Sequence, residues 1–133
     1  MKRTAIALRI FSGLDGLALI TLGLFIWVGN ADALITLHMS LGIALIVALW
    51  VLAALAAVSG VAPGLIVTGV VWGLLTVALG LAQTRILPDS GHWIIETLHL
   101  LVGVVAVVLT QILATRIASG PRASRDAGRA PAV

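Results

Sequence analysis

Two histidines lie inside long apolar stretches of this sequence. His38 stands in the stretch 34–58 and His99 in the stretch 93–117. If these stretches cross a membrane, each imidazole must be hydrogen-bonded, paired or bound to a metal, and a histidine so placed predicts a functional site. We therefore take His38 and His99 as the first candidates for a binding site.

A third histidine extends the possible ligand set. His92, Glu96 and His99 fall at i, i+4 and i+7, on one face of a helix. With His38 opposite, they would form a nitrogen and oxygen set suited to a single zinc or iron ion. A two-metal site is disfavoured because the first half has Ile35 in place of a second carboxylate. The alternative for His92 and Glu96 is a solvated helix start, where the helix dipole favours an acid.

The elements that carry these residues are predicted by composition. Of the 133 residues, 61% are hydrophobic and 10% are charged, which is too apolar for a soluble domain of this size. Four apolar runs each reach the roughly 20 residues that cross a bilayer. We expect helices at 5–28, 34–58, 65–86 and 93–117.

Short breaks between these runs favour antiparallel neighbours. The expected fold class is an all-α integral membrane protein, a four-transmembrane up-and-down helix bundle. Residues 1–119 would form this domain, and residues 120–133 a basic, flexible cytoplasmic tail rich in Pro, Arg, Ala, Ser and Gly. There are no cysteines, so disulfides and thiolate metal sites are excluded.

The basic residues are a topology signal, not a nucleic-acid footprint. Most of them fall on the side that holds both termini, where cytoplasmic loops carry their excess of Lys and Arg. The opposite side has Arg85 together with three acids. We expect the inner (plasma) membrane of a prokaryotic-type cell, with both termini cytoplasmic. The terminal-side residues are Lys2, Arg3, Arg9, Arg116, Arg122, Arg125 and Arg129.

The first apolar run contains an acidic residue, whose charge costs free energy within a membrane. Asp15 follows Arg9 by six residues, so it lies ~9 Å further into the membrane. An embedded acid in the first helix of a four-helix protein resembles the small multidrug transporters, although the glutamate and tyrosines of that family are missing here. The alternative is an acid near the inner interface that pairs with Arg9, Arg116 or another basic residue, or that is protonated.

The chain contains an internal repeat. The segment 37–42, LHMSLG, matches 98–103, LHLLVG, at an offset of 61 residues, and the preceding runs match at an offset of 57. We therefore expect two similar helical hairpins, related as parallel repeats about an axis along the membrane normal. His38 and His99 would then lie at one depth, ~10 Å from the outer ends of their helices, and could face each other.

Glycines accompany the histidines. Each histidine has a glycine one helical turn further along its own face, Gly42 or Gly103. The other two helices carry stripes of small residues, for which close helix packing is the alternative role. These stripes include Gly16 and Gly23 in the first run and Gly73 and Gly80 in the third.

The two His-x-x-x-Gly elements and the four-helix core resemble the membrane-bound b-type cytochromes. In that family, histidines from facing helices ligate haem iron on both sides. The resemblance implies one haem b near the outer face with His38 and His99 as iron ligands, and Arg85 as the first choice to receive its propionates. It implies cofactor contact for Gly42, Gly103, Gly16, Gly23, Gly73 and Gly80.

The resemblance implies electron transfer, as a small cytochrome or as a subunit of a larger membrane redox complex. The alternatives that stay open are a cofactor-free accessory subunit, whose histidines hydrogen-bond across the bundle, and a proton-coupled transporter. The expected surroundings are the lipid bilayer, a redox partner or larger complex, and a homo-oligomer. No motif points to a hydrolase, and whether the chain is an enzyme stays open.

Overall fold

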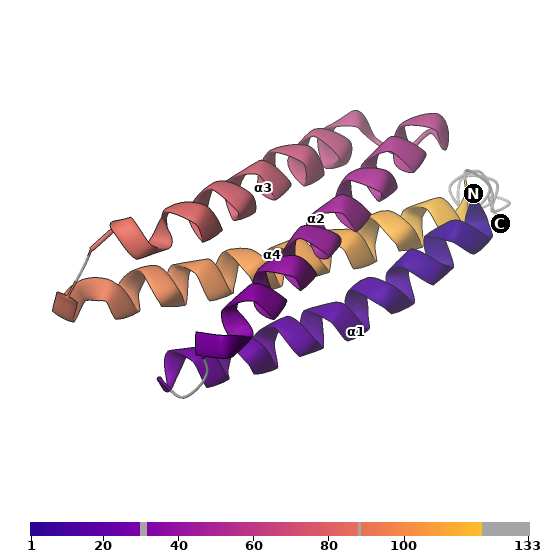
Figure 1. Cartoon of the computed structure of the whole chain (residues 1–133). Coiled ribbons are helices and arrows are strands. Elements are labelled where there is room, and N and C mark those ends of the chain that lie inside the picture. The colour runs from indigo at the N-terminus through magenta and orange to yellow at the C-terminus, as the bar shows by residue number, and fades with distance from the viewer. Residues whose placement is uncertain (30–31, 88, 121–133) are drawn as a thin grey trace, which may run out of the picture.

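The computed structural model describes residues 1–29, 32–87 and 89–120. These residues form four long helices and no strand (Figure 1). The helices are α1 (Lys2–Trp27), α2 (Ile35–Val58), α3 (Pro63–Ala82) and α4 (His92–Ser119). Single turns of 3₁₀ helix lie between them, η1 (Asp32–Leu34), η2 (Gln83–Arg85) and η3 (Asp89–Gly91). The expected tail falls on residues 121–133, outside the described residues.

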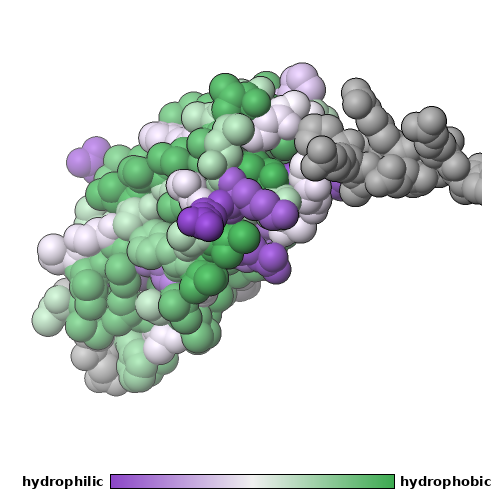
Figure 2. Space-filling view, turned by 90° about the vertical axis from the view of Figure 1, so that its right-hand side faces the viewer, coloured by the Kyte–Doolittle hydropathy of each residue, from purple (hydrophilic) through white to green (hydrophobic). Residues whose placement is uncertain are grey.

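The four helices run up and down as an antiparallel bundle, which confirms the expected fold class (Figure 1). Each is long and apolar enough to cross a membrane. The outer surface is largely hydrophobic in the view of Figure 2, with few hydrophilic residues. Exposed apolar side chains cover all four helices, for example Leu17, Ile43, Val71 and Leu101. The chain is therefore a multi-pass membrane protein whose outward faces suit lipid.

The two ends of the bundle differ. We call the end with Lys2 and Ser119 the terminal end, and the end where α1 passes to α2 and α3 to α4 the histidine end. The turn from α2 to α3 also lies at the terminal end. It contains Gly60 at a φ of +73°, in the left-handed region that glycine adopts readily.

Helix boundaries differ from the expected ones by a few residues. α1 begins at Lys2, because Lys and Arg are good helix formers although they are not part of the apolar run. α3 begins at Pro63, where the fixed φ of proline suits a first helical position. It ends at Ala82 and tightens into η2. α4 continues to Ser119 and stops before Gly120, whose φ is +67°.

The core lies between α2 and α4. These helices contact each other, α1 packs against both, and α3 packs against both from the other side. Leu49 and Leu52 of α2 and Leu113 of α4 are the largest fully buried apolar side chains. A long buried leucine is worth roughly 1.5–3 kcal/mol in water, but in lipid the gain comes mainly from close packing. The central pair is thus the rigid support for any residue that faces inward.

The internal repeat is visible in the helix crossings. A Cβ atom added at Gly16 of α1 would lie 2.7 Å from Val107 of α4. One added at Gly73 of α3 would lie 3.3 Å from Ile46 of α2 and 2.5 Å from Trp50. Val107 and Ile46 are equivalent at the offset of 61. The two halves therefore pack alike, and these two glycines let the helices approach closely.

Candidate functional site

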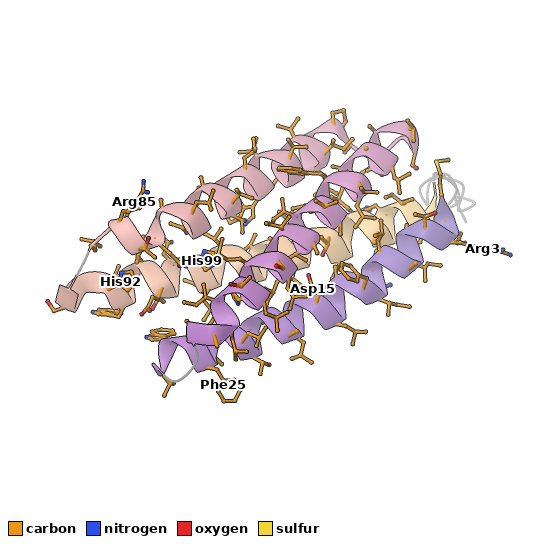
Figure 3. All side chains as sticks on the ribbon, in the orientation of Figure 1. Arg3, Asp15, Phe25, Arg85, His92 and His99 are labelled. Atoms are coloured by element: carbon orange, nitrogen blue, oxygen red, sulfur yellow. The ribbon has the colours of Figure 1, made fainter. Side chains whose placement is uncertain are left out.

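The two histidine rings meet in the interior near the histidine end. His38 lies early in α2 and His99 early in α4, and both side chains are half-buried. Their ring centroids are 6.3 Å apart and their planes are tilted by 55°. His99 is marked in Figure 3 on the part of α4 near His92 and Arg85. The expectation that the repeat brings His38 and His99 opposite each other agrees with the distance between the ring centroids, and the two rings are tilted.

Each imidazole rests on a glycine of the preceding helix. A Cβ atom added at Gly23 of α1 would lie 3.4 Å from Cε1 of His38 and 3.9 Å from its Nδ1. The equivalent distances from Gly80 of α3 to His99 are 3.2 and 3.9 Å. In both rings the Nδ1–Cε1 edge faces the glycine, so Nε2 lies further from it. Gly23 and Gly80 thus make room for the imidazoles and hold their orientation.

One nitrogen of each imidazole is left without a partner among the described residues. Nδ1 of His38 and Nδ1 of His99 are buried, and neither has a hydrogen-bond partner among the described residues. A buried polar atom left in this way costs about 1–3 kcal/mol, which a hydrogen bond to a water molecule would offset. Among the described residues no hydrogen bond to His99 crosses the bundle, whereas the backbone of Leu19 on α1 lies within hydrogen-bonding reach of the His38 imidazole.

The remaining glycines fall into two groups. Gly42 and Gly103 are one turn beyond the histidines, and an added Cβ at either would meet nothing within 4 Å. Neither glycine therefore contacts a histidine ring in this structure. Gly16 and Gly73 instead sit at the helix crossings, against Val107 and Trp50. The structure brings neither of these two to a histidine.

Arg85 lies at the same end of the bundle as the histidines, at the last position of η2. It is exposed, and its side chain points away from the bundle in Figure 3. A long arginine side chain in this place can turn toward an anionic group at the surface. Contact between Arg85 and the histidine pair is not part of this conformation.

The four-ligand metal set does not form. His92 Nε2 and Glu96 Oε1 are 3.9 Å apart, as a partly exposed pair on one face of α4. Among residues 1–29, 32–87 and 89–120, no group of three or more His, Asp or Glu side chains could hold a metal ion. The hypothesis of a zinc or iron ion bound by His38, His92, Glu96 and His99 is therefore not supported, and His92 belongs to a solvated helix start.

The spacing of the rings suits axial ligation of haem iron. Two imidazole–metal bonds of about 2 Å, plus roughly 1.1 Å from each nitrogen to its ring centre, require centroids about 6.2 Å apart. The observed separation is 6.3 Å. The angle between the rings is less restrictive, because each imidazole can rotate about its bond to the metal. The separation of the His38 and His99 rings is therefore close to the one that two imidazole ligands of one metal would need.

A second polar group lies nearer the terminal end, between α1 and α4. Gln111 donates through Nε2 to Ser12 Oγ and to the carbonyl oxygen of Arg9, both at 3.0 Å. Arg9 Nε donates to Gln111 Oε1 at 3.3 Å. Asp15 is 5% exposed, and neither of its carboxylate oxygens has a hydrogen-bond partner in the part of the chain that the structure describes. The pairing of Asp15 with Arg9 or Arg116 is not found in the described residues.

Asp15 stands out in the sequence, but the hydrogen-bonded residues of α1 and α4 near it do not. Gln111 is a lone polar residue in an apolar run, and its role depends on which face of α4 meets α1. The sequence does contain one indication that Gln111 is special. At the offset of 61, Gln111 is equivalent to Trp50, so a polar residue stands in one half where the other half has an aromatic one.

Comparison of the chain with protein-family models, with curated proteins and with solved structures found no match. Its function is therefore inferred from its own residues and their geometry.

Proposed function

We propose that this chain is a membrane b-type haem protein that transfers electrons, with His38 and His99 as the two axial ligands of one haem. The observation that carries this proposal is the separation of 6.3 Å between the two ring centroids, across the rigid α2–α4 pair. The resemblance to membrane-bound b-type cytochromes supports the same reading. When bound, the haem supplies a reversible one-electron change at its iron.

The residues of the chain would hold the haem and orient its two histidine ligands. Both imidazoles come from helices of the core, so their distance is set by packed side chains and not by a loop. Gly23 and Gly80 leave room for the Nδ1–Cε1 edges of the two imidazoles. Two histidine ligands close both axial positions, which favours electron transfer over catalysis at the metal. Arg85 would turn to pair with a propionate by charge-assisted hydrogen bonds.

The proposal includes an orientation. Lys2, Arg3, Arg9 and Arg116 lie on the terminal side, and an excess of Lys and Arg marks the cytoplasmic side. The termini would then be cytoplasmic in a prokaryotic-type plasma membrane, and the haem would lie near the outer face. A redox partner or a larger membrane complex would exchange electrons there. Contact with a second copy through the apolar outer faces is compatible with the same role.

The proposal is tested by removing each histidine in turn. His38→Ala and His99→Ala should each lose most of the bound haem, because one imidazole alone leaves the iron without its second ligand. His92→Ala is the matched control, since this histidine lies on α4 outside the pair and should retain the haem. The measurement is the haem-to-protein ratio of the purified variants, from the pyridine haemochrome spectrum and the protein mass.

Two results of this experiment would count against the proposal. One is equal haem content in all three variants, which would mean adventitious binding. The other is a colourless wild-type protein after expression with ample haem. The second result would favour a cofactor-free accessory subunit, whose partner would survive both histidine substitutions.

A further inference from the structure

The two halves of the bundle differ at one place, the contact of α1 with α4. We use the name polar seam for Arg9, Ser12 and Asp15 of α1 together with Thr110 and Gln111 of α4. In the other half, the equivalent positions on α3 and α2 at offsets of 57 and 61 are apolar or small. They are Ile66, Gly69, Trp72, Leu49 and Trp50.

The polar seam runs from the surface to a buried acid. Arg9 is exposed, Gln111 is half-buried, and Ser12 and Thr110 have no exposed surface. Asp15 lies one turn beyond Ser12. It falls along α1 between the Ser12–Gln111 hydrogen bond and the Gly16–Val107 contact. In Figure 3 it stands on the middle part of α1, away from Arg3 at the terminal end.

The donors around Asp15 are already engaged. Ser12 Oγ donates to the carbonyl oxygen of Arg9, and Thr110 Oγ1 donates to that of Val107. Gln111 Nε2 donates to Arg9 and Ser12. An ionised carboxylate only accepts hydrogen bonds, whereas a protonated one brings its own donor. The protonated form is therefore the one that this environment can satisfy.

No charged group compensates the acid. The elements packed against α1 are α2, α4 and η1. None of their titratable or basic side chains with described positions makes a hydrogen bond or an ion pair with Asp15, and neither does a basic residue of α1. These residues are His38 on α2, His92, Glu96, His99 and Arg116 on α4, and Lys2, Arg3 and Arg9 on α1.

We propose that Asp15 is a reversible proton-binding site inside the bundle, reached from the terminal end through the polar seam. Proton release breaks the O–H bond of the carboxyl group and forms hydronium with a water molecule, leaving a carboxylate. The path passes Arg9 and Gln111, where the second half of the bundle presents Ile66 and Trp50 and gives no such access. This site needs no haem, so the proposal about Asp15 can be tested independently of the proposed electron transfer.

Carbodiimide labelling tests whether Asp15 carries a proton. Dicyclohexylcarbodiimide adds to protonated carboxyl groups in apolar surroundings, and its adduct is found by mass spectrometry of the full chain and its peptides. In lipid vesicles at neutral pH we expect the adduct on Asp15, less of it at alkaline pH, and none in Asp15→Asn. Glu96→Gln is the matched control and should label like the wild type.

The opposite results are distinct. Wild-type protein without an adduct on Asp15 at any pH would overturn the proposal, because the acid would then be ionised or covered. Protection by Na⁺ at constant pH would mean a metal-cation site and would also overturn it.

Hydrogen–deuterium exchange tests the path. The carboxyl C=O band in the infrared spectrum shifts when the proton of Asp15 is replaced by deuterium. Gln111→Leu should slow this shift roughly tenfold or more, because exchange then requires local opening of the bundle. Trp50→Leu, the same change at the equivalent place in the other half, should leave the rate unaltered. Equal rates in both variants would contradict access through the polar seam.

Discussion

The positions of the two imidazole rings depend on a glycine next to each ring. His38 and His99 each use the space that a missing side chain leaves on the neighbouring helix, at 3.4 and 3.2 Å from a notional Cβ. Neither Nδ1 has a partner among the described residues. The two glycines therefore provide the space that the imidazole rings occupy. The Nδ1 atoms of both rings are still free to form a hydrogen bond with a ligand or a water molecule.

A large side chain at Gly80 should displace His99. In Gly80→Leu the new side chain would occupy the place of Cε1, so the imidazole must swing out of line and haem binding should fall to a small fraction of wild type. Gly64→Leu is the control on the same helix, because a Cβ there meets nothing within 4 Å. The haem-to-protein ratio measures both. Full haem content in Gly80→Leu would mean that the ring position is not needed for binding.

At the scale of helices, the repeat explains most of what could be read from the sequence. Four spans, their antiparallel order and the opposition of His38 to His99 follow from apolar runs, short breaks and one offset. The rotation of each helix about its axis does not follow, because apolar residues occur on all sides of each helix and polar residues are few. For this reason the sequence did not separate Gly23, which backs an imidazole, from Gly16, which lies at a helix crossing.

The crossing of α1 and α4 gives a stability prediction. Gly16→Ala places a methyl group 2.7 Å from Val107, a β-branched side chain that yields little. Such overpacking should destabilise the protein by about 1–3 kcal/mol. Val107→Ala added to it should restore most of the loss. Thermal unfolding in detergent measures this, and Gly13→Ala is the tolerated control, with 3.7 Å to its nearest neighbour. Additive losses in the double variant would refute the proposed contact.

At the scale of the whole molecule, one end differs from the other in charge and in chemistry. The histidine pair lies toward the end with Arg85, and the buried acid Asp15 lies on the middle part of α1, with the polar seam between it and the terminal end. The polar seam occurs in one half only. The repeated helical hairpins therefore carry two different sites, the histidine pair and Asp15. An electron site and a proton site would then face opposite sides of one membrane.

The orientation can be measured because the chain contains no cysteine. Ser59→Cys lies between α2 and α3 at the terminal end, and Ser90→Cys lies in η3 at the histidine end. With membrane-impermeant maleimide on intact cells, Ser90→Cys should be labelled and Ser59→Cys only after the membrane is opened. The reverse pattern would place the histidine pair on the cytoplasmic side.

The most direct test of the central claim is the visible spectrum of the detergent-purified wild-type protein, first air-oxidised and then reduced with dithionite. A haem held by His38 and His99 is six-coordinate, so sharp α and β bands should appear on reduction. Added carbon monoxide should leave them unchanged, since both axial positions are filled. A colourless protein, or a reduced haem that binds carbon monoxide at once, would contradict ligation by this pair.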